Sequence, residues 1–165
     1  LKEIIVALIF TALVRTLIGL VPAILLTSPL FGVSILNLGL PLILLFLSLY
    51  IFGITLGLFV SAGLIRFGPS FENIAWSSLF LLAPLGCIYY PIEILPNFFQ
   101  IIAKSLPLVY IFDEARNILL NGFINYENLR QAYYLNLAYL AFGIFLFYSS
   151  FLKARIKGTL INMGE

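Results

Sequence analysis

The chain has 165 residues, of which 62% are hydrophobic and only 10% charged, and its formal net charge is +2. Soluble domains carry about 25% charged residues, so this composition predicts an all-α polytopic membrane protein whose solvent is lipid. The small net charge gives no indication of nucleic-acid binding. The sequence lacks histidine, the commonest metal ligand, and its single cysteine, Cys87, excludes an internal disulfide.

Four stretches are long and apolar enough to cross a bilayer. At 1.5 Å per residue each corresponds to about 25–39 Å of helix, against about 30 Å of hydrocarbon. They run from about Ile4 to Thr27, Leu40 to Ile65, Ile74 to Tyr90, and Tyr133 to Leu152. Breakers separate the first three, at Ser28-Pro29, Gly32, Gly39 and Pro41, and then at Gly68-Pro69-Ser70. We therefore predict one transmembrane domain over residues 1–165.

Arg15 is the only charged residue from Ile4 to Ile65. It lies about 17 Å into the first predicted span, where an unpaired charge costs several kcal/mol. One interpretation is an interior Arg that pairs with an acid or contacts anionic cargo. The other is a structural Arg that reaches to the interface, or a span that begins later than Ile4.

In the second predicted span, Gly53, Gly57 and Ser61 recur every four residues. Small residues at this spacing let two membrane helices approach closely. We expect helix packing here, within one subunit or across a dimer, with a direct role in cargo passage as the alternative.

Glu72 and Asn73 open the third predicted span, and Trp76 follows. A carboxylate at a helix start suits the helix dipole, and Trp is typical of the membrane interface. The interpretation is capping and anchoring; the alternative is a cytoplasmic loop that senses an ATPase.

The segment from Tyr89 to Arg116 contains three prolines, Pro91, Pro96 and Pro107. The apolar stretch between Pro96 and Pro107 covers about 15 Å as a helix, roughly half a bilayer core. It is too short to span and too apolar for an ordinary loop. We therefore predict a re-entrant or broken helical hairpin before the last span, and a transport pathway beside it.

Charged residues flank this broken segment. Glu93 lies between the first two prolines, and Asp113, Glu114 and Arg116 follow the third. We expect Glu114 or Asp113 to pair with Lys104 or Arg116. These groups are interpreted as an ion-pair set that holds the re-entrant element, or as an extracellular gate or cargo-exit rim.

Charge asymmetry predicts the orientation. If Lys2 is cytoplasmic, alternation of the four spans places the Arg66 loop and the C-terminus inside as well. The inside set is then Lys2, Arg66, Lys153, Arg155 and Lys157, and the outside set is Lys104, Arg116 and Arg130. This agrees with the positive-inside rule and predicts a plasma-membrane protein with a cytoplasmic C-terminus.

Five features occur in an order that resembles the C-terminal two-thirds of an ABC-2 type transporter permease, the membrane subunit of ABC exporters. They are Glu3-Ile4-Ile5 with Leu13-Val14-Arg15; Arg66-Phe67-Gly68 with Glu72, Asn73 and Trp76; Pro84-Leu85-Gly86 with Tyr90-Pro91 and Leu95-Pro96; Leu106-Pro107-Leu108 through Tyr110 with Glu114-Ala115-Arg116; and a basic tail ending near Gly158.

The resemblance implies a permease that exports a drug-like, lipid-linked, amphipathic or polysaccharide cargo. It also implies a dimer of permeases with two ATP-binding subunits. The chain has no G-x-x-x-x-G-K-[ST] motif, so ATP and Mg are expected in the partner and no cofactor in this chain. Family members usually have two further spans and a coupling helix in front. Since the chain starts at Leu1, in mid-pattern, we expect it to be the C-terminal part of a longer protein.

Three other classes remain open. A membrane-embedded enzyme needs a nucleophile and base, or clustered carboxylates, inside the bilayer, and the predicted spans contain no acid. The same observation speaks against a secondary transporter coupled to protons or sodium. A non-catalytic scaffold subunit is the third alternative.

Overall fold

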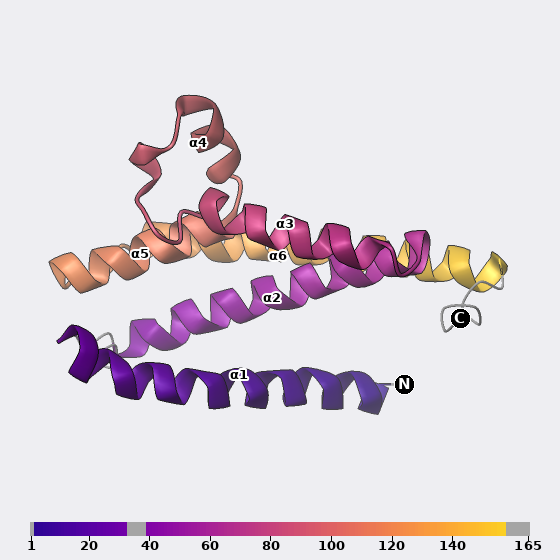
Figure 1. Cartoon of the computed structure of the whole chain (residues 1–165), viewed down its shortest axis with the longest axis horizontal. Helices are drawn as coiled ribbons and strands as arrows, with labels where there is room; N and C mark the ends of the chain where they lie inside the picture. Colours follow the sequence, from indigo (N-terminus) through magenta and orange to yellow (C-terminus); the bar gives the residue numbers. More distant parts are fainter. Residues whose placement is uncertain (1, 33–38, 158–165) are drawn as a thin grey trace. The chain divides into compact units, whose positions relative to one another are not determined.

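The computed structural model describes residues 2–32 and 39–157, and the described residues form helices without strands (Figure 1). Three of these helices are long and apolar enough to cross a membrane, over Phe10–Thr27, Leu40–Phe67 and Tyr126–Ile156. The prediction of an all-helical chain is thus confirmed for the described residues, and the three apolar helices are compatible with a membrane protein. Gly158, where the predicted basic tail ends, lies outside the described residues. The chain divides into two compact units, Leu1–Leu44 and Leu45–Glu165, which are taken separately below.

The first unit consists of helix α1 (Lys2–Phe31) and the start of α2 (Leu40–Phe67). Helix α1 continues through Pro22 and Pro29, beyond the end predicted at Thr27. Its described side chains are exposed or half-buried, and large apolar ones such as Phe10 and Ile18 are 65% and 68% exposed. A helix that is apolar all round is suited to lipid or to a partner helix.

In the second unit, α2 is followed by a tight turn and helix α3 (Phe71–Leu85). Gly68 adopts a left-handed φ of 81° and its N–H bonds back to the carbonyl of Leu64, which ends α2 as a glycine C-cap does. The ring of Phe71 packs directly on Gly63, where an added Cβ would overlap it. The absence of a side chain at Gly63 therefore lets α3 fold back closely against α2.

Helix α3 has 15 residues, or about 22 Å, which is short of a hydrocarbon core. It ends at Leu85 rather than at the predicted Tyr90, because Pro84 and Gly86 interrupt the helix there. Helix α3 is not one of the three helices that are long and apolar enough to span a membrane. The predicted third span is thus only partly formed by this helix.

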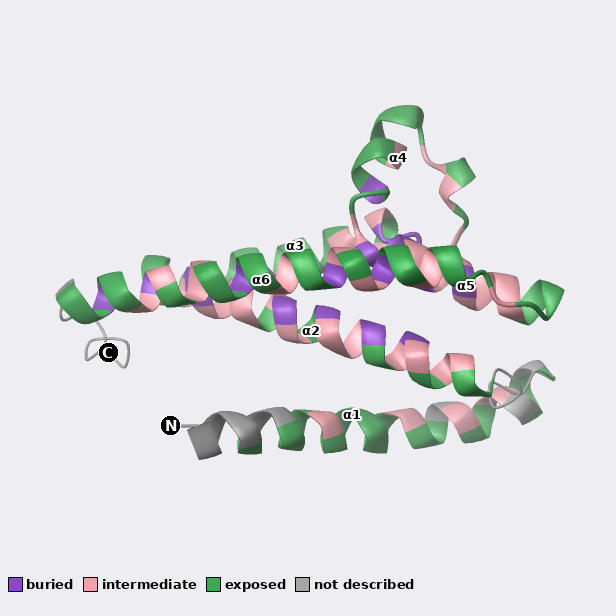
Figure 2. Cartoon of the chain, turned by 180° about the vertical axis from the view of Figure 1, so that it is seen from behind, coloured by how far each residue is buried: buried purple, intermediate pink, exposed green. Residues whose placement is uncertain are grey.

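After α3 come a 3₁₀ turn, η2 (Ile92–Ile94), the short α4 (Asn97–Ala103), and α5 (Pro107–Asn121). Gly122, with a left-handed φ of 73°, ends α5, and α6 (Tyr126–Lys157) follows. Figures 1 and 2 show α3 and α5 one after the other along α6, with α4 projecting from the break between them. The broken segment predicted before the last span is present as this projection, and its re-entry into the membrane stays a prediction.

Helices α2 and α6 run parallel and pack through small and polar side chains. Asn136 on α6 donates from Nδ2 to the backbone oxygen of Ser48 on α2 at 2.9 Å and to its Oγ at 2.8 Å. Seven residues further on, a Cβ added at Gly143 would lie 3.6 Å from the oxygen of Thr55, which is seven residues after Ser48. The two contacts are seven residues apart on both helices and follow each other in the same direction. Helices α2 and α6 therefore form a parallel, coiled-coil-like pair, and these contacts are its seam.

Candidate functional site

The candidate site is the break between α3 and α5, where the hairpin of residues 86–106 leaves the line of the two helices. Pro107 is the first residue of α5 and is fully buried, a position where the missing N–H costs nothing. Pro91 and Pro96 precede η2 and α4 and are exposed. The three predicted prolines thus delimit the elements of the hairpin.

Cys87 is the first turning point of the hairpin. It is fully buried and its φ is +52°, a left-handed conformation that non-glycine residues rarely adopt. Such backbone costs of the order of 1–3 kcal/mol and persists only where surrounding contacts hold it. Cys87 lies in the loop after α3.

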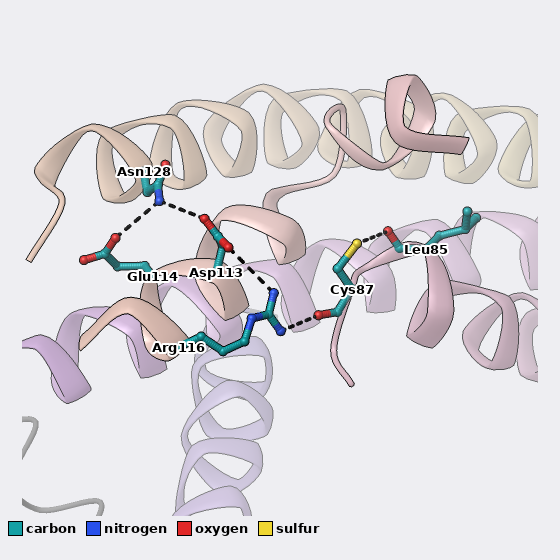
Figure 3. A network of polar contacts seen from close by, with 6 residues as sticks. All are labelled: Leu85, Cys87, Asp113, Glu114, Arg116 and Asn128. Atoms are coloured by element: carbon teal, nitrogen blue, oxygen red, sulfur yellow. Dashed lines mark hydrogen bonds and ion pairs between the residues drawn. The ribbon is translucent and has the colours of Figure 1, made fainter. Parts of the chain in front are cut away.

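Arg116 on α5 supplies a contact that holds this turn (Figure 3). Its Nη1 donates a 2.9 Å hydrogen bond to the backbone oxygen of Cys87. Its Nη2 lies 3.8 Å from Oδ1 of Asp113, one turn earlier on α5. Nη2 is buried and forms no hydrogen bond within the described part of the chain. The predicted pairing of an α5 acid with Arg116 is therefore present for Asp113, as an ion pair without a hydrogen bond.

Glu114 is 1% exposed and is held by amides instead of a cation. Its Oε1 accepts the backbone N–H of Asn125 at 2.7 Å, and its Oε2 accepts from Nδ2 of Asn128 at 3.4 Å. The same Nδ2 lies 3.2 Å from Oδ2 of Asp113. Because Asn125 and Asn128 are at the start of α6, the positive end of that helix dipole faces the buried carboxylate.

The remaining predicted residues lie away from this cluster. Glu93 on η2 and Lys104 after α4 are exposed, and neither forms an ion pair among the described residues. Glu72 is exposed in the first turn of α3. The N-cap of that helix is Ser70, which forms no side-chain capping bond, so Glu72 and Asn73 do not occupy the cap position. Arg15 is exposed on α1.

The face of α2 that carries Gly53, Gly57 and Ser61 differs from the face that contacts α6. Gly53 and Gly57 are exposed, and a Cβ added at either would have no described atom within 4 Å. The contact with α6 uses Ser48 and Thr55 instead. Close packing on the glycine face therefore stays a prediction.

Sequence reasoning missed three asparagines of the second unit. Asn125 through its backbone N–H and Asn128 through its side chain fix Glu114, and the side chain of Asn136 joins α6 to α2. A signal for Asn136 was present, since it is the only asparagine in the predicted fourth span, and a lone amide in an apolar helix is typical of an interhelical hydrogen bond.

Most of the hairpin is exposed (Figure 2), and large apolar side chains lie there beside the charged Glu93 and Lys104. The large exposed apolar side chains of the hairpin are Tyr89 at 80%, Ile94 at 67%, Phe98 at 68%, Phe99 at 44%, Ile101 at 73% and Ile102 at 39%. In water such a surface would be unfavourable. Lipid is a suitable solvent for it, provided that the backbone polar groups are satisfied within the hairpin.

Comparisons of the chain with protein-family models, with curated proteins and with solved structures gave no match.

Proposed function

We propose that the segment from α3 to α5 is an interrupted crossing of the membrane, the third in chain order. The observation that supports it is the parallel pairing of α2 and α6. If both helices span in the same direction, the chain between them has to return across the bilayer. Helices α3 and α5 have 15 residues each, together about 45 Å of helix, comparable with the 32 residues of α6. The hairpin then projects from the middle of this return.

We further propose that the chain is the permease subunit of an ATP-driven exporter of the ABC-2 type. The cargo class is amphipathic, lipid-linked, drug-like or polysaccharide. The proposal is supported by the position of the resemblance motifs: the prolines delimit the hairpin, and Arg116 of the Glu114-Ala115-Arg116 stretch reaches from α5 to the backbone of Cys87 at its start. ATP and Mg belong to a separate ATP-binding subunit, because the sequence has no P-loop.

In this proposal the protein lies in the plasma membrane with a cytoplasmic C-terminus and pairs with a second permease, itself or a related one. The parallel direction of α2 and α6 is consistent with this alternation, which gives the second and fourth crossings the same direction. ATP-driven closure of the partner subunits then moves the spans between inward- and outward-facing states.

The test is biochemical. The full-length protein is co-expressed with the ATP-binding subunit encoded beside it and purified in lipid. We expect the two to co-elute, and the permease to change the ATPase rate. Absence of a complex with every co-encoded ATPase would contradict the exporter proposal and favour a scaffold.

One observation favours a second candidate, a secondary transporter. Glu114 is a buried carboxylate without a cationic partner among the described residues, and such groups mark proton and sodium pathways in membranes. Transport in vesicles that is driven by a pH gradient without ATP, and is lost in Glu114→Gln, would support this candidate over the exporter.

A further inference from the structure

The hairpin of residues 86–106 has internal contacts of its own. Cys87 and Ala103 are buried against Val109 at the start of α5, and four half-buried residues pack on them: Tyr90, Ile92, Leu95 and Leu106. Gln100 donates to the oxygen of Leu95 at 2.8 Å within the hairpin. These contacts pack the two ends of the hairpin together and against the start of α5.

Two tyrosines close the ends of the hairpin. Tyr90 Oη donates to the oxygen of Pro84 at the end of α3, at 2.8 Å, and Tyr110 Oη donates to the oxygen of Lys104, at 3.0 Å. Both bonds join residues six apart in the sequence and so act locally. Arg116, by contrast, is nine residues into α5 and 29 residues from Cys87 in sequence, and its bond ties the α3 end of the hairpin to the middle of α5.

The contact between Arg116 and Cys87 is suited to release. It consists of a single hydrogen bond to a backbone oxygen, and the second terminal nitrogen of Arg116 has no hydrogen bond within the described residues. Asp113 lies 3.8 Å from that nitrogen and its side chain is 46% exposed, so it is an alternative partner already in place. The left-handed backbone of Cys87 adds a conformation that would relax once the contact is lost.

We propose that Arg116 is a latch, which holds the hairpin against α5 through the backbone oxygen of Cys87 and, when released toward Asp113, lets the hairpin swing away from α5. This motion would bend the chain at the two ends of the hairpin, which the hydrogen bonds of Tyr90 and Tyr110 bridge. The latch does not depend on ATP coupling. In a permease the same motion would open the side of the interrupted crossing.

Cys87 is a native reporter for the latch, because it is the only cysteine in the sequence and is fully buried. The full-length protein in lipid nanodiscs is treated with a membrane-permeant maleimide, and the labelling rate of Cys87 is measured by mass spectrometry on the peptide that contains it. We expect slow labelling of the unaltered protein and an increase of about tenfold or more in Arg116→Gln, the factor that corresponds to the loss of a charge-assisted hydrogen bond. Arg116→Lys, which keeps a charged donor, should label at an intermediate rate.

Arg130→Gln is the matched control. It removes the same charge from an exposed arginine on α6 whose ion pair with Glu127 is also exposed, so its labelling rate should equal that of the unaltered protein. An unchanged rate in Arg116→Gln would overturn the latch. An equal increase of the Cys87 labelling rate in Arg116→Gln and Arg130→Gln would also overturn the latch, since loss of any positive charge would then explain the faster labelling.

Hydrogen exchange separates latch release from loss of the fold. Faster exchange of residues 88–106 in Arg116→Gln, with Asn136 and its neighbours on α6 still protected, supports the latch. Faster exchange of α2 and α6 in both Arg116→Gln and Arg116→Lys would assign Arg116 a general structural role and overturn the proposal. Neither readout involves the ATP-binding subunit, so failure of the latch is distinguishable from failure of the proposed function.

Discussion

At the scale of single residues, Asn136 shows how one amide can fix the register of two apolar helices. Its orientation is settled by chemistry: the backbone oxygen of Ser48 only accepts, so the atom facing it has to be Nδ2. Its Oδ1 is buried without a hydrogen-bond partner among the described residues. In lipid an alternative register would lose both bonds to Ser48, which specifies the pairing of α2 with α6.

We expect Asn136→Ala to lower the free energy of unfolding by about 0.5–2 kcal/mol, the range of interhelical hydrogen bonds in membranes. Ser48→Ala should cost less, because the backbone oxygen of residue 48 stays available. Thermal unfolding in lipid nanodiscs measures both. The control is Ser77→Ala, an exposed hydroxyl that bonds to the oxygen of Asn73 in its own helix. Equal effects at residues 136 and 77 would show that the seam adds no stability.

Two glycines of α2 provide a second comparison at this scale. An added methyl at Gly63 overlaps the ring of Phe71, whereas at Gly57 it meets no described atom. We expect Gly63→Ala to destabilise the protein by about 1–3 kcal/mol through overpacking. Gly57→Ala should be neutral or stabilising by up to about 1 kcal/mol within this unit.

The same thermal unfolding measures both variants. If Gly57→Ala destabilises the protein as much as Gly63→Ala does, the exposed glycine face must be occupied in the membrane by another helix. That result would support the predicted packing role of Gly53, Gly57 and Ser61.

At the scale of elements, the corner between α5 and α6 depends on a buried carboxylate. Gly122 ends α5, Asn125 caps α6 by accepting the N–H of Glu127 at 3.0 Å, and Glu114 accepts the N–H of Asn125. Removal of the carboxylate leaves donors without an acceptor, which is costly in a buried site.

We therefore expect Glu114→Ala to lower the free energy of unfolding by about 1–3 kcal/mol, and Glu114→Gln to lower it less, because the amide oxygen still accepts one bond. Hydrogen exchange at residues 122–130 should increase in the same order. Glu127→Gln, at an exposed acid in the first turn of α6, is the matched control and should change stability by less than about 1 kcal/mol. If Glu127→Gln destabilised the protein more than the Glu114 variants do, the stabilising carboxylate would be Glu127 and not Glu114.

The elements also show how far the sequence predicts this structure. Apolar stretches over Leu40–Ile65 and Tyr133–Leu152 predicted α2 and α6 well, because length and hydropathy are local properties. The prolines predicted the hairpin for the same reason. The early end of α3 and the contact between Arg116 and Cys87 depend on residues that meet only after folding, and no local pattern indicates them.

At the scale of the whole molecule, the relative direction of α2 and α6 determines how the chain between them has to run. Parallel α2 and α6 require a return between them, and the interrupted pair α3 and α5 is the available chain. An unbroken helix would return the chain from the end of α2 to the start of α6 with fewer residues. We infer that the break has a functional reason, which the exporter proposal and the latch of Arg116 both place at the hairpin.

The most direct test of this account is the depth of the hairpin in the membrane. Trp76 is the only tryptophan in the sequence, so Trp76→Phe combined with Phe98→Trp places a single fluorophore on the exposed surface of α4. We expect nitroxides on lipid acyl chains to quench it strongly and aqueous iodide to have little effect. Strong quenching by iodide with none by lipid nitroxides would place the hairpin in water and contradict the interrupted crossing.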